Sequence, residues 1–320
     1  MDKKIILFGG DPNSINSEII FKSWKVLNNN IKRKIYIVTS YNLLKDQFKK
    51  LKYNLKVIKV KNINELPKNN NIKVLNVDIK YKNPFKISNK ENSKFLEKSL
   101  NYSHKLSLNK KIAGFINCPI NKNLLKKKNI GLTEFLAAKC KIIKDTEVML
   151  IRNQKLSVSP ITTHINLKNV SKKINKNIII KKIKTLDTWF RKYEKKKPMI
   201  CLLGLNPHNA EFAKNSEEKK TIIPVIKFLR KKGIKIEGPA SGDTVFINKY
   251  KRYDIIVGMF HDQVLIPFKT LFKFDAINIT LGLKYLRVSP DHGIASDIIC
   301  KNKANPLSLI NCVKFINKFS

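Results

Sequence analysis

The fold is decided by residues 253–297, which read YDIIVGMFHDQVLIPFKTLFKFDAINITLGLKYLRVSPDHGIASD. The stretch opens with an apolar run, residues 255–260, whose bounds predict a buried strand of a parallel sheet. That strand ends directly in His261-Asp262-Gln263. Ligands collect at the carboxyl ends of strands in open α/β sheets, so this position is well placed for chemistry. A second pair, Asp291-His292, precedes Gly293 and a predicted helix.

The same pattern of short apolar runs recurs along the chain. Strands are predicted over residues 5–8, 35–38, 55–60, 74–77, 113–116, 148–151, 156–161 and 199–203. Helices are predicted over residues 92–108, 171–193, 221–232 and 306–319. This alternation indicates an α/β fold with a largely parallel sheet. The first strand runs into Gly9-Gly10 but lacks the later glycines of a dinucleotide fingerprint, so a standard Rossmann domain is not predicted.

The charge of the chain is strongly positive. Lys and Arg number 65 against 23 Asp and Glu, a formal net charge of +42. Such a balance suggests nucleic acid or an anionic surface as partner. The lysines are spread along the whole chain among Asn and Ile, however, without a basic tail or a stripe of interleaved aromatics. A biased base composition would enrich the same residues, so we favour drift over the solvated surface, with an anionic partner as the alternative. The field should in either case attract phosphorylated or carboxylate substrates.

The spacing of the cysteines and the hydropathy of the chain both bear on where the protein is located. None of the five cysteines is in CxxC spacing, which predicts reduced thiols rather than a zinc–thiolate site. No apolar run is long enough to span a bilayer. The start MDKKIILFGGDP is interpreted as a first strand, not a signal peptide. We therefore expect a cytoplasmic protein with no membrane partner.

Three histidines share one sequence context. His164, His208 and His261 each follow a predicted strand, and the strand ends of a parallel sheet lie on one rim. Neutral imidazoles suit Zn, Mn, Co or Fe(II). Three protein ligands with an open position would make a catalytic metal site that polarises a substrate oxygen. Each histidine could equally be a hydrogen-bonded structural residue.

Carboxylates and cations lie close to these histidines in the sequence. Asp243, Asp262 and Asp291 are candidates to orient the imidazoles, or turn formers and helix caps. Lys269 and Arg287 could hold an anion, and the planar guanidinium fits phosphate or carboxylate. Arg287 is the more informative of the two because arginine is scarce beside lysine in this chain.

Several segments resemble the 4-hydroxythreonine-4-phosphate dehydrogenase family of pyridoxal 5'-phosphate (vitamin B6) synthesis. The matching segments are GGDP at 9–12, NCPINK at 117–122, GLTEFLA at 131–137, TTHI at 162–165, GLNPHNAE at 204–211, GPASGDT at 238–244 and nearly all of 253–306. They run from end to end of the chain in the family's order. The combination of GLNPH, HDQ, INITLGL and SPDHG is highly specific.

The resemblance implies an isocitrate/isopropylmalate-dehydrogenase-like fold, with two α/β lobes and an active-site cleft between them. It also implies a homodimer with its active site at the subunit interface, and NAD binding without a Rossmann fingerprint. We expect residues 1–125 and 270–320 to form the cofactor-side lobe. Residues 126–269 are expected to form the second lobe, with the metal ligands and the dimer interface.

The resemblance also assigns roles to residues. A divalent metal (Zn, Mg, Mn or Co) would be held by His164, His208 and His261, the last crossing the dimer interface. The implied substrate contacts are Thr133, Lys269, Asn278 and Arg287, and the expected catalytic residues are Lys269, Asp243 and Asp262. The expected contacts to NAD or NADP are Asp291, His292 and Gly293.

The implied reaction is oxidation of a small phosphorylated amino acid, 4-phosphooxy-L-threonine, at its C3 hydroxyl. Hydride passes to NAD(P), and the β-keto acid loses CO2 to give 3-amino-2-oxopropyl phosphate. Two departures from the family pattern matter. Leu132 stands where the family's GHTEF motif has His, and the family loop GDPAGIGPE here reads GDPNSINSE. They keep open a sister dehydrogenase acting on a phosphorylated threonate-type acid or a cis-dihydrodiol. A more remote alternative is a basic nucleic-acid-binding protein without catalysis.

Overall fold

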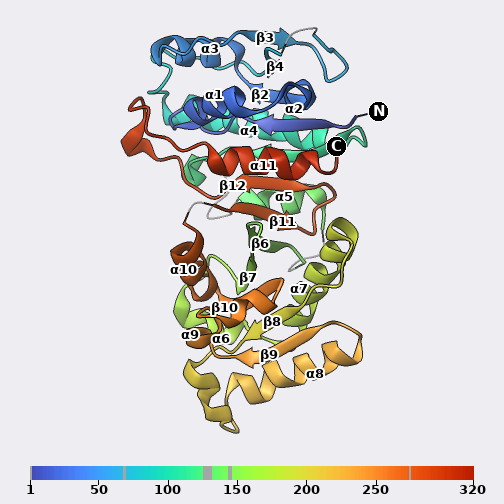
Figure 1. The fold of residues 1–320 in the computed structure, drawn as a ribbon. Helices are drawn as coiled ribbons and strands as arrows, with labels where there is room; N and C mark the ends of the chain where they lie inside the picture. Colours follow the sequence, from blue (N-terminus) through green and yellow to red (C-terminus); the bar gives the residue numbers. More distant parts are fainter. Residues whose placement is uncertain (1, 68–69, 125–131, 143–145, 274) are drawn as a thin grey trace. The chain divides into compact units, whose positions relative to one another are not determined.

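The chain folds into two compact units in the computed structural model (Figure 1). The structure describes residues 2–67, 70–124, 132–142, 146–273 and 275–320. The first unit comprises Met1–Ala138 and Lys284–Ser320, and the second comprises Lys139–Leu283. The lobe boundaries expected after residues 125 and 269 thus compare with unit boundaries after Ala138 and Leu283.

The first unit contains a parallel sheet with the strand order β3-β4-β2-β1-β5-β12. Its strands are β1 (Lys4–Phe8), β2 (Ile35–Thr39), β3 (Val57–Val60), β4 (Ile72–Asn76), β5 (Ile112–Asn117) and β12 (Arg287–Pro290). Its helices are α1 (Asn16–Val26), α2 (Asn29–Lys34), α3 (Tyr41–Lys50), α4 (Asn89–Ser107) and α11 (Leu307–Asn317). The helix α5 (Leu132–Cys140) begins in this unit.

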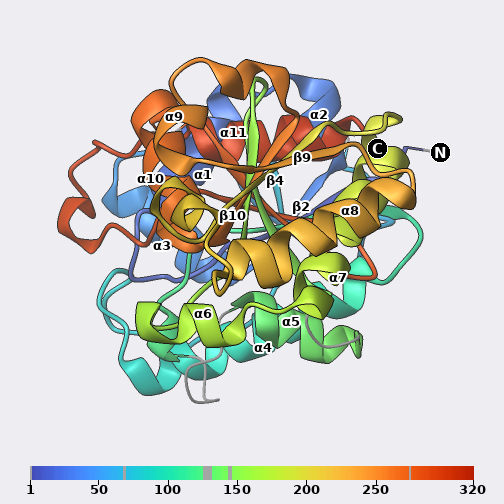
Figure 2. The same ribbon diagram turned by 90° about the horizontal axis from the view of Figure 1, so that it is seen from below.

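The strands of this sheet are apolar on both faces because helices cover both. Ile5, Ile6, Leu7 and Phe8 of β1 are at most 3% exposed. Figure 2 shows α4 and α11 on opposite sides of the sheet, and both helices contact β1 and β5. The C-terminal helix α11 also packs against α1. A continuous apolar run is what a doubly covered parallel strand requires.

The second unit contains a mixed sheet with the strand order β11-β6-β7-β10-β8-β9. Its strands are β6 (Val148–Arg152), β7 (Ser157–Thr162), β8 (Ile200–Leu203), β9 (Ile236–Ala240), β10 (Ile255–Phe260) and β11 (Ile277–Leu281). β6 is antiparallel to both β11 and β7, and the remaining neighbours are parallel. Its helices are α6 (Val170–Lys173), α7 (Lys176–Trp189), α8 (Ile223–Lys231), α9 (Gly242–Val245) and α10 (His261–Phe272). One core cluster joins strand residues such as Val158, Cys201 and Ile256 to Val264 and Phe268 of α10.

Two of the predicted helices are wrong in extent. The helix expected after Gly293 is only a 3-10 turn, Ser296–Ile298, because left-handed backbone at Ala295 and Cys300 interrupts the segment. The helix expected over 171–193 is broken at Asn175, whose backbone is extended and whose side chain caps α7 by accepting from the Ile178 N–H. It continues beyond α7 as a π-helical turn, Phe190–Glu194.

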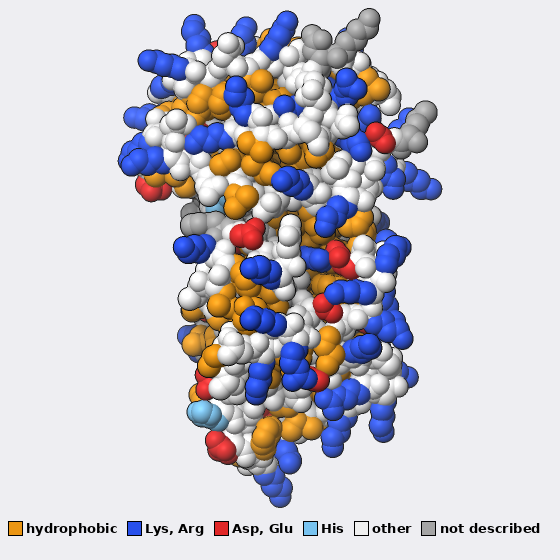
Figure 3. Space-filling view, viewed as in Figure 1, with side chains coloured by type: hydrophobic (Ala, Val, Ile, Leu, Met, Phe, Trp, Pro, Cys, Tyr) orange, Lys and Arg blue, Asp and Glu red, His pale blue; other side chains and the backbone are white. Residues whose placement is uncertain are grey.

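The surface is rich in basic side chains, and the cysteines are free thiols. Figure 3 shows lysine and arginine side chains scattered over both units on the face drawn, with few acidic ones among them. All five cysteines are free, and only Cys300 is exposed. No helix within the described ranges has the length and apolarity needed to cross a membrane.

Candidate active site

A buried arginine lies beside the carboxyl end of β5 in the first unit's sheet. Arg287, the first residue of β12, is 3% exposed. Its Nε donates to Asn117 Oδ1 at 2.7 Å, and its Nη1 donates to Thr133 Oγ1 at 3.2 Å. Asn117 ends β5, and Thr133 lies in the first turn of α5. The structure therefore brings together Thr133 and Arg287, two of the predicted substrate contacts.

This arrangement suits an anionic ligand. Burying a guanidinium is costly unless it is hydrogen-bonded, and the two side-chain oxygens supply part of that requirement. Both of these acceptors are neutral groups. The first turn of a helix also presents backbone N–H groups that favour anions. Asn117 was not among the predicted site residues, although its place at a strand end was a usable signal.

Asp11 ties together the loops beside this arginine cluster. It is 2% exposed and accepts hydrogen bonds from the N–H groups of Asn13 and Asn121 and from the side chain of Asn92. The altered loop 9–17 is filled by Asn16, whose Nδ2 donates to Pro119 O at 2.9 Å and to Asp11 O at 3.2 Å. The amide therefore supports the turn in a way that the family's glycine at this position could not.

The predicted cofactor contacts follow β12 at the same sheet edge. The Asp291 N–H donates to Ser308 Oγ at 2.9 Å, and His292 Nδ1 lies 2.9 Å from the Gly293 carbonyl oxygen. The Ile15 N–H donates to the next carbonyl, that of Ile294, which places this segment beside the loop after β1. Contact with NAD or NADP stays a prediction for these three residues.

Two of the three histidines meet at the carboxyl edge of the second unit's sheet. Phe260 of β10 is in register with Thr162 of β7. His261 directly follows the first of these residues, and His164 follows two residues after the second. Their rings lie 5.7 Å apart between centroids. Thr162 Oγ1 also donates to Met259 O at 2.7 Å, which fixes the two strand ends together.

Gln263 links the same strand end to the histidine loop after β8. Its Nε2 donates to Gly204 O at 2.7 Å, and its Oε1 accepts from the Met259 N–H at 2.7 Å. The side chain therefore spans β10 and the start of the segment that carries His208. Within the HDQ motif, the glutamine is accordingly a positioning residue for the loops.

Asp262 contacts the imidazole that it was expected to orient. Its Oδ1 lies 2.6 Å from His261 Nδ1. A carboxylate on one ring nitrogen fixes the orientation of the ring and increases the basicity of the other nitrogen, which is the arrangement found behind metal-bound histidines. His261 Nε2 is therefore the nitrogen positioned to act as a ligand.

His208 lies on an unusual turn. His208, Asn209, Ala210, Glu211 and Phe212 all have positive φ, between 46° and 59°. A left-handed backbone conformation costs a free energy of roughly 1–2 kcal/mol per non-glycine residue. Contacts with the surrounding structure must therefore stabilise this turn.

The residue that holds this turn is Glu218, which is fully buried. Its Oε1 accepts from the N–H groups of Leu205 and Asn206 at 2.7 and 2.9 Å, and its Oε2 accepts from Asn206 Nδ2 at 3.0 Å. Burial by itself raises the pKa of Glu218, but the hydrogen bonds from Asn206 and Leu205 outweigh burial and leave the pKa below its ordinary value. Glu218 was not predicted from the sequence.

Asp243 carries a negative charge near His208. The Ser241 hydroxyl donates to Asp243 Oδ1 at 2.6 Å, and this bond is the main cause of the lowered pKa of Asp243. The charge of His208 lowers that pKa further. Asp243 is exposed and is therefore accessible to a ligand.

The described residues do not bring the three predicted metal ligands together. In the part of the chain that the structure describes, no group of three or more His, Cys, Asp and Glu side chains is placed to hold a metal ion. His164 and His261 adjoin each other, and His208 lies within electrostatic range of Asp243. A metal bound by all three histidines stays a prediction.

The remaining predicted substrate contacts also lie in the second unit. Lys269 is on α10, about two turns after His261, and is partly exposed. Asn278 is on β11, and its Oδ1 is buried with no hydrogen-bond partner among the described residues. An unsatisfied buried acceptor is costly, so this oxygen suits a donor group on a ligand. Gly131 and the side chains of Lys122 and Glu134, from matched motifs, lie outside the described residues.

The fold and the site together define a class of protein. Several candidate groups, His164, His208 and His261 among them, follow the carboxyl ends of α/β-sheet strands, as in enzymes acting on small ligands. The candidate groups include a buried arginine for an anion and imidazoles suited to a metal. The chain belongs to the pyridoxal phosphate biosynthetic protein PdxA family, whose model matches residues 30–316.

Alignments with curated relatives cover nearly the whole chain. The chain is 38% identical to the 4-hydroxythreonine-4-phosphate dehydrogenase of Sulfurihydrogenibium sp., over 97% of this chain and 96% of that one. It is 36% identical to the enzyme of the same name from Aquifex aeolicus, over 99% and 98%. Among solved structures, the Klebsiella pneumoniae 4-hydroxythreonine-4-phosphate dehydrogenase superposes with a TM-score of 0.86 at 27% identity, covering 99% of each chain.

More distant structures establish the fold alone. The isocitrate dehydrogenase of Methylococcus capsulatus matches with a TM-score of 0.50 at 12% identity, over 99% of this chain and 85% of that one. These likenesses confirm the expected isocitrate-dehydrogenase-like α/β fold.

Proposed function

We propose that the chain is a cytoplasmic 4-hydroxythreonine-4-phosphate dehydrogenase that uses NAD or NADP. The observation that carries the proposal is the buried Arg287, bonded to Asn117 and Thr133, in a chain that belongs to the PdxA family. The substrate, 4-phosphooxy-L-threonine, offers a carboxylate and a phosphate to cationic groups. The positive surface attracts such a dianion from solution.

The reaction has two stages. In the first, the C3 hydrogen leaves as hydride to the nicotinamide, and the C3 hydroxyl proton passes to a base. In the second, the C–C bond to the carboxylate breaks, CO2 leaves, and the carbon left behind takes up a proton, which gives 3-amino-2-oxopropyl phosphate. Lys269, Asp243 and Asp262 are the residues that we propose for these proton transfers.

The chain's own polar groups would position the substrate. Arg287 and Thr133 present two hydrogen-bonding side chains beside the end of β5, and Lys269 adds a partly exposed cation. Asn278 Oδ1, buried without a described partner, would accept from a donor on the ligand. Binding energy from the anionic groups holds the hydroxyl carbon in place for hydride transfer.

His164, His208 and His261 would hold the metal, with His261 crossing to the partner's site in a homodimer. The imidazole donor set fits Zn, Mn or Co better than Mg, which prefers oxygen ligands. When bound, the divalent metal supplies Lewis-acid polarisation of the substrate oxygen. Asp262 orients His261, and Glu218 holds the turn that carries His208.

The nucleotide is proposed to lie on the segment Asp291-His292-Gly293. This segment follows β12 at the carboxyl edge of the first unit's sheet. It lies beside the loop after β1, because the Ile15 N–H bonds the carbonyl of Ile294. Small residues and backbone groups at such an edge are the usual neighbours of a nucleotide in α/β folds.

One observation favours a sister substrate. Leu132, at the start of α5, is 7% exposed and has no hydrogen-bonding group where the family pattern has His. The loss of one polar contact would favour a phosphorylated threonate-type acid or a cis-dihydrodiol over the amino acid. The neighbouring Thr133 is retained, which supports the amino acid substrate as the first choice.

The test is NADH formation by the purified protein with 4-phosphooxy-L-threonine and NAD, before and after EDTA. We expect metal-dependent NADH formation, and little with 4-hydroxy-L-threonine, which lacks the phosphate. Activity restricted to phosphorylated threonate or to a cis-dihydrodiol would replace the proposal with the sister dehydrogenase. In that case Leu132→His should restore activity with the amino acid.

A further inference from the structure

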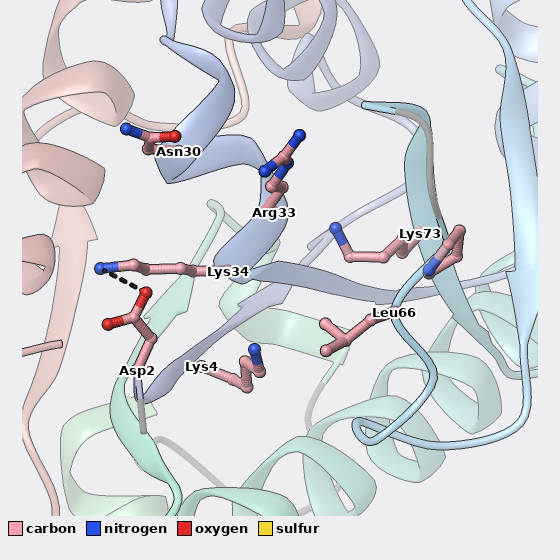
Figure 4. Close-up of a pocket in the computed structure, with 8 residues that line it drawn as sticks. Asp2, Lys4, Asn30, Arg33, Lys34, Leu66 and Lys73 are labelled. Carbon is pink, nitrogen blue, oxygen red and sulfur yellow. Dashed lines mark ion pairs between the residues drawn. The ribbon is translucent and has the colours of Figure 1, made fainter.

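A cationic pocket lies at the amino ends of the strands in the first unit. It has a volume of about 510 Å³ (Figure 4). Lys4 begins β1, Lys34 immediately precedes β2, and Lys73 is the second residue of β4. Arg33, in the last turn of α2, also lines the pocket. Four cations from three separate segments of the chain therefore gather around one hollow.

These cations are only weakly compensated by acidic groups. Asp2 lies 3.7 Å from Lys34, and its side chain is 71% exposed, so the pair contributes little. Lys73 is 2% exposed, and its Nζ donates to the Lys32 carbonyl oxygen, a neutral acceptor. Burial, and then the charge of Lys4, lower the pKa of Lys73 to about 8.

A structural role accounts for only part of the cluster. Arg33 and Lys34 lie in the last turn of α2, where positive charge complements the helix dipole. Lys73 Nζ also bonds a carbonyl in that last turn, Lys32 O, and so gains from the dipole, whereas Lys4 belongs to β1 and does not. Bringing their like charges together opposes folding, whereas a bound anion would reverse the sign of that interaction.

The shape and lining of the pocket indicate the class of ligand. Its volume falls within the range of about 300–1,000 Å³ that is typical of small-molecule sites. Leu66, which is 61% exposed, lies beside the cations (Figure 4). Pro67 also lines the pocket, so the two residues give it an apolar wall. An inorganic ion would leave this wall unused.

We propose that this pocket binds an organic phosphate monoester, with the phosphate on the four cations and the organic group against Leu66 and Pro67. The pocket is separate from the Arg287 cluster, which lies beside the carboxyl end of β5 in the same parallel sheet. Strands of this length hold the two edges on the order of 15 Å apart. The ligand would therefore be a second bound molecule, in addition to the substrate.

The experiment is a calorimetric titration of the full chain at low salt with phenyl phosphate and, separately, with inorganic phosphate. We expect saturable binding of phenyl phosphate that is tighter than that of inorganic phosphate. Lys4→Gln and Arg33→Gln should each weaken it about tenfold, because each removes one charge-assisted contact. The matched control is Lys45→Gln, an exposed lysine on α3, and it should bind as the unmodified chain does.

Three results would overturn the proposal. The first is equal affinity for phenyl phosphate and inorganic phosphate, which would remove the organic group from the site. The second is equal weakening by Lys45→Gln and Lys4→Gln, which would reduce the binding to the general positive field. The third is loss of all phenyl phosphate binding in Arg287→Lys, a variant in which the pocket residues are unchanged. That result would place the ligand at the Arg287 cluster instead of the pocket. Thermal melting of each variant confirms that it folds.

Discussion

Arg287 Nε donates a 2.7 Å hydrogen bond to Asn117 Oδ1, from the first residue of β12 to the last residue of the neighbouring parallel strand β5. The two residues are 170 positions apart in the chain and are both about 3% exposed. With Thr133 on a second nitrogen, the orientation of the guanidinium plane is fixed. A fixed, buried, planar fork of this kind recognises carboxylate or phosphate by geometry as well as by charge.

Arg287→Lys should lower kcat/KM sharply while keeping the charge. Lysine lacks the fork and cannot bond Asn117 and Thr133 while also reaching a ligand. Loss of a charge-assisted bond of about 2–3 kcal/mol corresponds to a fall of roughly 30- to 150-fold. The fall in kcat/KM is measured by steady-state NADH formation. Arg252→Lys, at an arginine whose side chain is 64% exposed, is the matched control and should be unchanged. Equal kcat/KM for both variants would exclude substrate recognition by Arg287.

Asp262→Asn should weaken metal binding without unfolding the protein. The side chain of Asp262 is 67% exposed and fixes His261 through a 2.6 Å contact, so its charge matters more to the imidazole than to the core. Removal of such a partner typically costs about 10- to 100-fold in metal affinity. The metal affinity of each variant is measured by competition with a chromophoric chelator. Asp297→Asn, at an exposed aspartate of the first unit, serves as control, and an affinity unchanged in Asp262→Asn would contradict the account.

Glu218→Gln should destabilise the protein by about 1–3 kcal/mol at neutral pH, because a buried charged acceptor of three hydrogen bonds is lost. The folded pKa of Glu218 lies below its ordinary value of 4.5. Its contribution is therefore present above about pH 4.5 and is lost as the pH falls through the lower folded value. Urea unfolding from pH 7 to pH 4 should show the difference between variant and parent shrinking.

The control for this experiment is Glu97→Gln, at an exposed position of α4. It should change stability little at any pH. A constant difference between Glu218→Gln and the parent across the acid range would show that the carboxylate charge of Glu218 contributes nothing.

Lys73 should make stability rise with pH in the alkaline range. Its folded pKa of about 8 lies below the ordinary 10.5, so the unfolded state binds more protons between these values. The cost of the buried charge is fully present below pH 8 and is relieved as the pH rises toward 10.5. Above pH 10 the raised pKa of Tyr36, about 12, acts in the opposite direction.

The difference between the parent and Lys73→Met isolates this effect. The stability of the parent relative to the variant should increase between pH 7.5 and 9.5 in urea unfolding, conditions chosen to bracket the folded pKa. Lys45→Met, at an exposed site, should show no such trend. A flat difference for Lys73→Met would mean that Lys73 titrates like an exposed lysine.

The positions of many strands could be predicted because each strand is a short run of apolar residues in the sequence. The strand predicted over 255–260 is β10 itself, and the strand predicted over 199–203 differs from β8 by one residue. Parallel strands ending at one edge led to the expectation that His164, His208 and His261 could converge; the rings of His164 and His261 are neighbours, and the three-histidine site stays a prediction. The proximity of Thr133 and Arg287 rested on the family resemblance instead.

The features that the sequence did not reveal depend on tertiary contacts. The left-handed turn at His208–Phe212 contains no glycine, the residue that usually indicates positive φ, so there was no reason in the sequence to predict it. Glu218, its anchor, resembles any surface glutamate until its burial is known. Lys73 is likewise one of 65 cationic residues, and only the neighbouring strand ends distinguish it. The break at Asn175 was missed because apolar periodicity continues on both sides of it.

The most direct test of the central claim is the ratio of CO2 released to NADH formed from 4-phosphooxy-L-threonine. The proposed reaction couples each hydride transfer to one decarboxylation, so we predict equal amounts of CO2 and NADH. Both should be abolished together by His208→Ala and by EDTA. NADH formation without CO2, or no NADH from this substrate in a protein that retains its metal, would contradict the account.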